Sequence, residues 1–369
     1  MLTQYPPSGF AEAVAAAILR RALQMLLKPV FSPKVSIARQ RRRLLRLARV
    51  TRVPKGVAFE PADVAGVPGE WVRRQAGPGQ VAPVRPGTLL YLHGGAYCLG
   101  SPRTHRALTG RLALGLGLPV LALDYRLAPE HPFPAALDDA LAAYRVLARQ
   151  GPVVIAGDSA GGGLALAVAL ALRDSGDPLD LAPAALVLFS PWVDMAMDQA
   201  PPAPPKGEAM LSVAWAQACA ALYLGKGVGS GVGTGVGTGV CTDDGATPPG
   251  HPWVSPLRAE LHGLPPTLIQ AGTDEMLHDQ ALALHAALVA ADVAVQCQIT
   301  PRRWHVFQLH AGSLRSADEA IARVLRFVQA ALDALPAGGP IRSAAVPANA
   351  ASPVSGSAVL APGEVTDHT

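Results

Sequence analysis

The chain has 369 residues, half of them hydrophobic, and a formal net charge of +4. This length suits one large α/β domain with additions or two smaller domains. No apolar run approaches the ~20 residues that span a bilayer, and the short apolar stretch 13–19 follows Glu12 instead of basic residues, which argues against a secretory signal. Scattered cysteines without metal-like spacing predict reduced thiols, a cytoplasmic protein and no bound metal: Cys98, Cys219, Cys241 and Cys297.

The positive charge is concentrated before Pro54, with six arginines between residues 39 and 49. Such a segment suits an anionic membrane surface or a nucleic acid. A solvated helix face is the alternative that we favour, because Leu44 and Leu47 stand among the arginines and can pack inward. We therefore expect no nucleic-acid partner and at most weak contact with a membrane surface.

Two helices are predicted in this N-terminal segment. Val14, Ile18 and Leu26 recur on one face of a helix over residues 11–27. A second helix is predicted over residues 35–50, after a proline break. The apolar face of the first helix needs an apolar surface to cover.

Strands and helices alternate through most of the remaining chain. A pair of strands at residues 56–59 and 69–73 is separated by turns rich in proline and glycine. This alternation predicts an α/β fold with a mostly parallel sheet covered by helices on both faces. The later elements are, in order, strand 88–92, helix 104–114, strand 119–123, helix 134–148, strand 153–157, helix 164–173, strand 184–189, strand 267–270, helix 280–291, strand 294–299 and helix 315–332.

Two segments do not fit this alternation. Residues 225–240 place glycine at nearly every second position, which leaves one face of a strand with nothing to pack and predicts a loop. Residues 336–369 are rich in Ala, Pro, Ser and Gly and are predicted to be a disordered tail.

The stretch 153–173 joins a β-branched run to an Ala/Leu-rich helix pattern through Gly157-Asp158-Ser159-Ala160-Gly161. Strand, tight turn with serine at the apex, and helix make up the context of a nucleophile elbow. Glycines at both ends of the motif leave room where a Cβ would collide with a neighbouring strand or helix. The amide of Ala160, at the start of the helix, is free to stabilise developing negative charge.

A serine nucleophile needs a base, an acid that orients the base, and donors for an oxyanion. Enzymes with this kind of elbow carry them in the order serine, acid, histidine. Asp274 follows the strand 267–270 and His305 follows the strand 294–299, so both are expected at the carboxyl edge of the sheet near Ser159. Six other candidates are weaker, being at a helix start, inside a helix, after an apolar pair or out of order: in turn His278 and Asp279, His285, His310, and His251 and His262.

The strand 88–92 ends in His93-Gly94-Gly95-Ala96-Tyr97, well upstream of the serine. Consecutive glycines allow backbone amides to approach a substrate closely. This stretch therefore predicts an oxyanion loop. The alternative is a simple glycine turn, in which His93 is only a buried, hydrogen-bonded side chain.

The chain resembles the bacterial hormone-sensitive-lipase-like esterases, called family IV of the α/β-hydrolases, over roughly residues 55 to 332. Besides the elbow and the oxyanion loop, the resemblance rests on several short motifs: Gly100-Ser101, Thr104-His105, Asp124 to Ala135, Ser190-Pro191-Trp192, Ser255-Pro256-Leu257, Gly272-Thr273-Asp274-Glu275 and His305-Val306-Phe307. Together these motifs are highly specific. Arg126 and Glu130 match family positions that we interpret as structural.

The resemblance implies an α/β-hydrolase fold, a triad of Ser159, Asp274 and His305, and no cofactor. It also implies an oxyanion hole made by three backbone amides, those of Gly94, Gly95 and Ala160. Residues 1–54 and a helix near 210–224 are expected to form a cap, with residues 55–335 as the catalytic domain and 197–250 as an insertion. Trp192 and Trp215 are candidate walls of the acyl pocket.

These features predict a carboxylic ester hydrolase that acts on small acyl esters of short to medium chain length through an acyl-enzyme. An amidase or deacetylase would use the same triad. A ligand-binding receptor on the same fold is disfavoured by His305. A binding module built on the basic segment is a further alternative, and a homodimer is compatible with the sequence.

Overall fold

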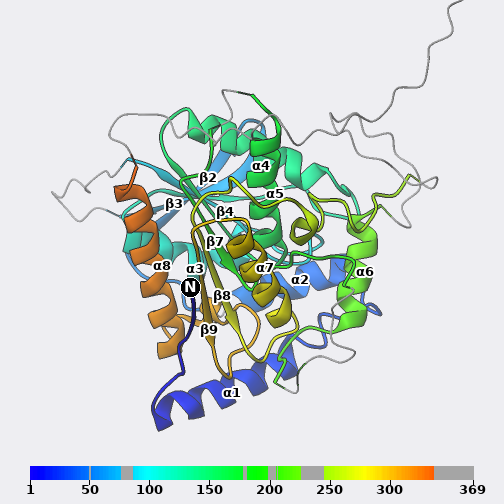
Figure 1. Ribbon diagram of the computed structural model, residues 1–369. Helices are drawn as coiled ribbons and strands as arrows, with labels where there is room; N and C mark the ends of the chain where they lie inside the picture. Colours follow the sequence, from blue (N-terminus) through cyan, green and yellow to red (C-terminus); the bar gives the residue numbers. More distant parts are fainter. Residues whose placement is uncertain are drawn as a thin grey trace, which may run out of the picture.

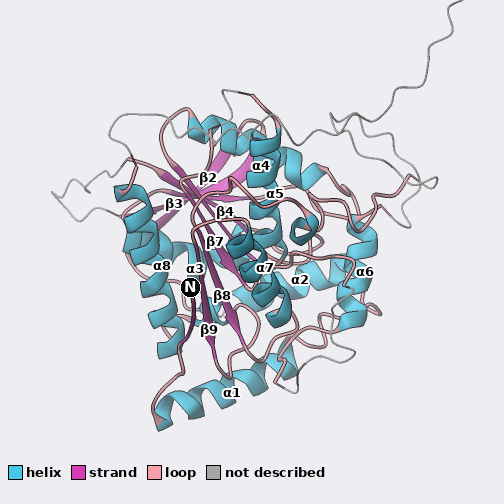
Figure 2. Cartoon of the chain, viewed as in Figure 1, coloured by secondary structure: helices cyan, strands magenta, loops and turns pink. Residues whose placement is uncertain are grey.

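A computed structural model describes residues 1–49, 51–75, 86–177, 181–197, 205, 207–225 and 245–335. Most of the predicted loop 225–240, the predicted tail 336–369 and Cys241 lie outside the described residues. Figure 1 follows the chain by colour, and Figure 2 separates the helices from the strands.

A nine-stranded sheet forms the centre of the molecule, in the order β1-β9-β8-β7-β6-β4-β5-β3-β2. β3 pairs antiparallel with both β2 and β5, and every other neighbouring pair is parallel. The predicted mostly parallel sheet is confirmed. Its strands are β1 (Leu2–Gln4), β2 (Val57–Val64), β3 (Val67–Arg74), β4 (Thr88–Leu92), β5 (Val120–Leu123), β6 (Val153–Asp158), β7 (Ala185–Phe189), β8 (Thr267–Gly272) and β9 (Val295–Thr300).

Helices cover both faces of the sheet (Figure 2). α3 and α8 pack against each other on one side, and α4 and α5 pack together on the other (Figure 1). The helices are α1 (Phe10–Leu26), α2 (Ile37–Ala48), α3 (Pro102–Leu116), α4 (Ala135–Ala148), α5 (Ala160–Asp174), α6 (Val213–Tyr223), α7 (His278–Ala290) and α8 (Arg315–Asp333), with short 3-10 helices at Pro256–Arg258 and Phe307–His310.

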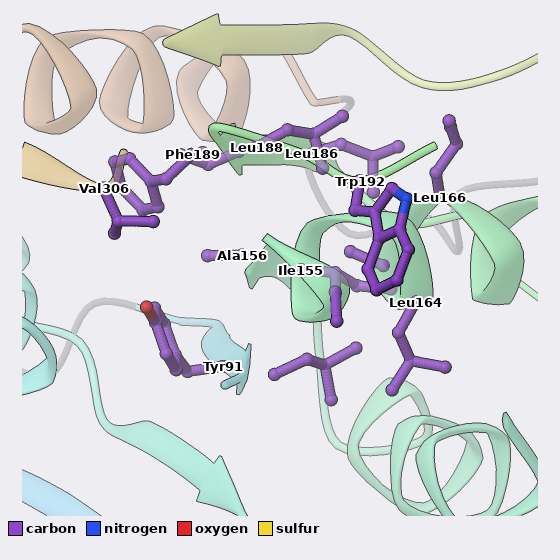
Figure 3. Close-up of a cluster of buried hydrophobic side chains, with 14 of the residues drawn as sticks. Tyr91, Ile155, Ala156, Leu164, Leu166, Leu186, Leu188, Phe189, Trp192 and Val306 are labelled. Atoms are coloured by element: carbon purple, nitrogen blue, oxygen red, sulfur yellow. The ribbon is translucent and has the colours of Figure 1, made fainter. Parts of the chain in front are cut away.

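The middle of the sheet is buried on both faces. β6 and β7 are buried along their whole length, and α5 is buried from Ala160 through Leu172. Figure 3 shows Ile155 of β6, Leu188 of β7 and Leu164 of α5 in one cluster of buried side chains. This core holds the β6–α5 turn, where Ser159 lies, on a rigid base.

One predicted packing is wrong. Val14, Ile18 and Leu26 of α1 were expected to cover an apolar surface, but their side chains are 41%, 66% and 54% exposed. The face of α1 that packs inward instead carries Ala16 and Leu23, which are both buried.

The N-terminal segment is fastened to the rest of the chain at two places. The guanidinium of Arg41, on α2, donates to the carbonyls of Cys98 and Ala128, each at 2.7 Å, and to the carboxylate of Glu130. The indole of Trp215, on α6, donates to the side chain of Gln40 at 2.9 Å. α2 is thereby held beside the segment that follows the glycine loop and against α6.

None of the described helices is both long and apolar enough to cross a membrane. The described cysteines, Cys98, Cys219 and Cys297, are buried free thiols.

Candidate active site

Ser159 lies at the junction of β6 and α5, with φ 53° and ψ −121°. A positive φ is strained for a residue with a Cβ, and it turns the chain sharply from strand to helix. A Cβ on Gly157 would collide with the backbone of Gly161, and a Cβ on Gly161 would collide with the backbone of Leu92. The structure thus forms the predicted elbow, and its two glycines are needed for close packing.

His305 follows β9 and is 4% exposed. Its Nδ1 lies 3.9 Å from Oε1 of Glu275, whose side chain is fully buried. Neither atom has a hydrogen-bond partner within the described part of the chain. Since catalytic hydrogen bonds are often long before substrate binds, a small side-chain movement would pair these two atoms.

Hydrogen bonds hold the other oxygen of Glu275. Oε2 accepts from the hydroxyl of Ser190 at 2.8 Å and from the amide of Gly272 at 3.1 Å. The Ser190 hydroxyl oxygen also accepts from the amide of Val306 at 3.1 Å. Ser190, at the end of β7, therefore joins the acid to the loop that carries His305. The motif Ser190-Pro191-Trp192 was visible in the sequence, but this role was not.

Asp274, the predicted acid, points elsewhere. Its carboxylate pairs with Arg20 of α1 at 2.8 Å and is 23% exposed. It lines a cavity of about 450 Å³ between α1 and the loops around residues 274 and 302, whose lining includes neither Ser159 nor His305. Adjacent residues in a turn project in different directions, and here Glu275 faces the histidine while Asp274 faces α1. The prediction of Asp274 as the partner of His305 disagrees with this geometry.

The surroundings of His305 raise its pKa. Burial alone would lower it, because the charged imidazolium loses hydration. The nearby carboxylate of Glu275 outweighs that effect, and the charges of Glu208 and Asp158 favour the cation as well. An imidazole that must accept a proton from serine is helped by acidic groups that stabilise its cation.

Glu208, which no sequence motif indicated, has a carboxylate side chain and is 2% exposed. Its Oε1 accepts from the amides of Met210 and Leu211, at 2.8 and 3.1 Å. Its Oε2 accepts from the amide of Met276 at 2.9 Å. Glu208 thus ties the segment before α6 to the residue that follows Glu275. The only signal in the sequence was an acid placed directly before the apolar residues 209–211.

The oxyanion loop differs from the prediction at one amide. The N–H of Gly94 donates to Oδ1 of Asp158 at 2.9 Å, so it is not free for a substrate. Gly95 and Ala96 adopt positive φ angles of 125° and 53°. No hydrogen bond among the described residues uses the amides of Gly95, Ala96 or Ala160. The amides left without a hydrogen bond in the described part of this loop and elbow are therefore those of Gly95, Ala96 and Ala160.

A buried polar cluster anchors this loop. Asp158 also accepts from the hydroxyl of Tyr91 at 2.6 Å, and its Oδ2 lies 3.3 Å from Nε2 of His105. Burial opposes the charge of this carboxylate, but His105 and Tyr91 hold its pKa below the usual value. His93 is buried and stacks on Tyr125, with ring centroids 4.3 Å apart. His93 therefore has the structural position considered in the sequence analysis.

The two predicted pocket tryptophans are both buried. Trp192 is 3% exposed and packs in the core beside Leu164 and Leu166 (Figure 3). Its indole donates to the carbonyl of Asp194 at 3.0 Å. Trp215 is 4% exposed and contacts Phe31, with ring centroids 4.8 Å apart. The structure places Trp192 in the core and Trp215 at the junction of α6 with the N-terminal segment.

The family motifs that we interpreted as structural make ion pairs. Arg126 forms a two-pronged pair with Asp139 of α4, and Glu130 pairs with Arg41 of α2. Among the residues that the structure describes, no cluster of three or more His, Cys, Asp or Glu side chains is arranged to hold a metal ion.

Comparison with known proteins agrees with this architecture. A family model described as the alpha/beta hydrolase fold matches residues 89–231 and 239–309. An acetyl-hydrolase of Streptomyces hygroscopicus is 39% identical over 324 residues, which cover 81% of this chain and 97% of that protein. An esterase of Acinetobacter venetianus is 34% identical, covering 86% of this chain and 94% of its own length.

Solved structures give the same result. The crystal structure of an esterase from the bacterial hormone-sensitive lipase family superposes with a TM-score of 0.71 at 34% identity, covering 88% of this chain and 99% of that one. An esterase/lipase from an uncultured bacterium gives a TM-score of 0.70 at 32% identity, covering 89% and 100%. The chain belongs to the bacterial hormone-sensitive-lipase-like esterases of the α/β-hydrolase fold, and it is a carboxylesterase-like serine hydrolase.

Proposed function

We propose that this protein hydrolyses short- to medium-chain acyl esters through an acyl-enzyme on Ser159, with His305 as the base and Glu275 as the acid that orients it. The observation that carries the proposal is the buried pair of Glu275 and His305, 3.9 Å apart and joined through Ser190. Ester hydrolysis itself is the activity named for the relatives.

In the first half-reaction, the Ser159 hydroxyl oxygen bonds to the ester carbonyl carbon while His305 takes the hydroxyl proton. The amides of Gly95, Ala96 and Ala160 donate to the resulting oxyanion. As the intermediate collapses, the carbon–oxygen bond to the alcohol breaks and His305 gives its proton to the departing oxygen. Glu275 stabilises the imidazolium and fixes the tautomer of His305 throughout.

Water then completes the cycle. His305 takes a proton from the water as its oxygen attacks the acyl carbon, and the same amides hold the second oxyanion. Collapse breaks the bond to the Ser159 oxygen, which recovers its proton from His305. The products are the carboxylic acid and the free enzyme.

Short acyl chains are supported by two observations. α2 is fixed beside the segment after the oxyanion loop through Arg41, and α6 is fixed to α2 through Trp215 and Gln40. These helices form a cap that limits the space for an acyl group. The names of two relatives contain acetyl-hydrolase, and an acetyl group has only two carbons. A closed pocket gains about 0.8 kcal/mol per buried methylene until the space is filled.

A series of nitrophenyl esters from acetate to palmitate tests this proposal. We expect kcat/KM to be highest at about four to eight carbons and to fall for longer chains, because further methylenes cannot be buried. Ser159→Ala should abolish turnover and labelling by a fluorophosphonate. A preference for palmitoyl esters, for amides over esters, or undiminished turnover by Ser159→Ala would overturn the proposal.

A further inference from the structure

The outward face of α1 is apolar and uncovered by any described residue. Phe10, Ile18 and Met25 are 86%, 66% and 68% exposed, and Val14 lies between them at 41%. Since a helix turns by about 100° per residue, these four side chains fall within an arc of about 80°. An exposed apolar stripe of this kind on a surface helix marks a site of interaction. We call these four residues the α1 stripe.

The N-terminal segment that carries the α1 stripe is strongly cationic. Residues 1–55 contain twelve lysines and arginines but only one acidic residue, so their formal charge is +11, whereas residues 56–369 carry −7. The single acid, Glu12, is buried and bonds to Ser316 and Arg303 on the inward side. Arg21 lies within the same arc as the stripe, and Lys28 follows at the end of the helix.

α2 and the residue that follows it carry further exposed arginines. They occupy positions that repeat at helical spacing: Arg39, Arg42, Arg43, Arg46 and Arg49. Apart from Glu12, the described part of the N-terminal segment offers no carboxylate to neutralise them.

We propose that the α1 stripe docks on the surface of an anionic lipid bilayer. The apolar side chains would enter the boundary between headgroups and acyl chains, and Arg21 and Lys28 would lie against the lipid phosphates. Pairing of the stripe with a second copy is disfavoured, because a two-fold contact would bring the cations of both copies together. This docking does not depend on which ester the enzyme prefers.

Docking at this face would also orient the enzyme. Arg20 of α1 holds Asp274 beside the acid Glu275, and Glu12 holds Arg303 two residues before His305. The helix that touches the bilayer is therefore fastened to the loops that carry the base and the acid. An enzyme held in this way would meet esters that dissolve in the membrane.

Vesicle binding by the full chain tests the proposal. Flotation with vesicles of phosphatidylcholine alone, and of equal parts phosphatidylcholine and phosphatidylglycerol, should show binding only to the anionic vesicles, weakened by added salt. The triple variant Phe10→Ser/Ile18→Ser/Met25→Ser should lower the partition coefficient at least ~10-fold, because it removes the inserting side chains. Arg21→Gln and Lys28→Gln should each lower it about fivefold.

Val289→Ser is the matched control, since Val289 is 51% exposed on α7, away from the stripe, and its loss should leave binding unchanged. Circular dichroism and thermal unfolding establish that each variant is folded. Failure of the wild-type chain to bind anionic vesicles, or unchanged binding by the folded triple variant, would overturn the proposal. Light scattering that finds a dimer which the triple variant dissociates would assign the stripe to a second copy instead and equally overturn it.

Discussion

At the scale of single residues, the position of Glu275 explains how the site is organised. One carboxylate oxygen is held by Ser190 and Gly272, which leaves the other oxygen to face Nδ1 of His305. An oriented acid of this kind fixes the histidine tautomer, so that the opposite ring nitrogen can accept the serine proton. Its neighbour Asp274 is occupied by Arg20 and partly solvated.

The pH dependence of activity follows from the same residues. His305 must be neutral to accept a proton, and the negative charges of Glu275, Glu208 and Asp158 raise its pKa. Activity should therefore rise with pH along a single limb whose midpoint lies above about 6.5, the ordinary histidine value. The measurement is kcat/KM for a nitrophenyl ester across pH. A midpoint below the ordinary value would mean that burial outweighs the acidic groups.

The sequence was informative about Ser159 and His305 because each stands in a motif at the end of a strand. It could not separate Asp274 from Glu275, because both satisfy the order of serine, acid and histidine. Only the direction of each side chain distinguishes them. Gly94 was predicted as an oxyanion donor from the local glycine pattern alone. Its amide donates instead to Asp158 on a neighbouring strand, and no local pattern reveals this contact.

At the scale of elements, alternating periodicity predicted the parallel sheet, because buried strands and helices differ clearly in pattern. β1 was missed, since three residues with mixed exposure carry no strand signal. α1 was found, but its orientation was reversed. An apolar stripe shows that a helix is amphipathic, but α1 also carries Ala16 and Leu23 on another side, which packs inward, and hydropathy alone does not separate the two sides.

Glu208 gives the clearest prediction about how elements cooperate. Glu208→Gln should lower kcat about ten- to a hundredfold. An amide has one acceptor oxygen where the carboxylate has two, so the segment before α6 would hold the loop at Met276 less firmly. The substitution should also move the acidic limb to lower pH, since one charge that raises the pKa of His305 is gone. Steady-state kinetics across pH measure both effects.

Glu60→Gln is the control for this substitution, because Glu60 is an exposed acid on β2 whose ion pair within the described residues is with Arg73. The acidic limb of the pH–activity profile of this variant should coincide with that of the wild type. If Glu208→Gln lost activity with an unshifted limb, Glu208 would be a purely structural residue.

At the scale of the whole molecule, the N-terminal segment is integrated with the catalytic domain. β1 extends the sheet beside β9, Glu12 reaches Arg303, and Arg41 reaches the carbonyls of Cys98 and Ala128. This segment thus supports the loops of the active site from one side and presents a cationic, apolar surface on the other. Removing it would expose part of the core and break these contacts.

The hydrogen bonds of Arg41 contribute to the stability of the folded protein. Arg41→Met should lower the free energy of unfolding by about 2 kcal/mol, because buried carbonyls and a carboxylate lose a charged donor. Urea denaturation gives the value. Arg42→Met, at an exposed position on the same helix, should stay within about 0.5 kcal/mol of the wild type. Equal effects of the two substitutions would show that the anchor contributes nothing specific.

The assignment of Glu275 as the acid is tested most directly by comparing Glu275→Gln with Asp274→Asn in the turnover of nitrophenyl butyrate. Glu275→Gln should reduce kcat by as much as ~10⁴, the loss seen when the aspartate of serine proteases is replaced by its amide. Asp274→Asn should stay within about tenfold of the wild type, since it only weakens the pair with Arg20. With both variants folded, the reverse pattern, a crippled Asp274→Asn and an active Glu275→Gln, would contradict the account.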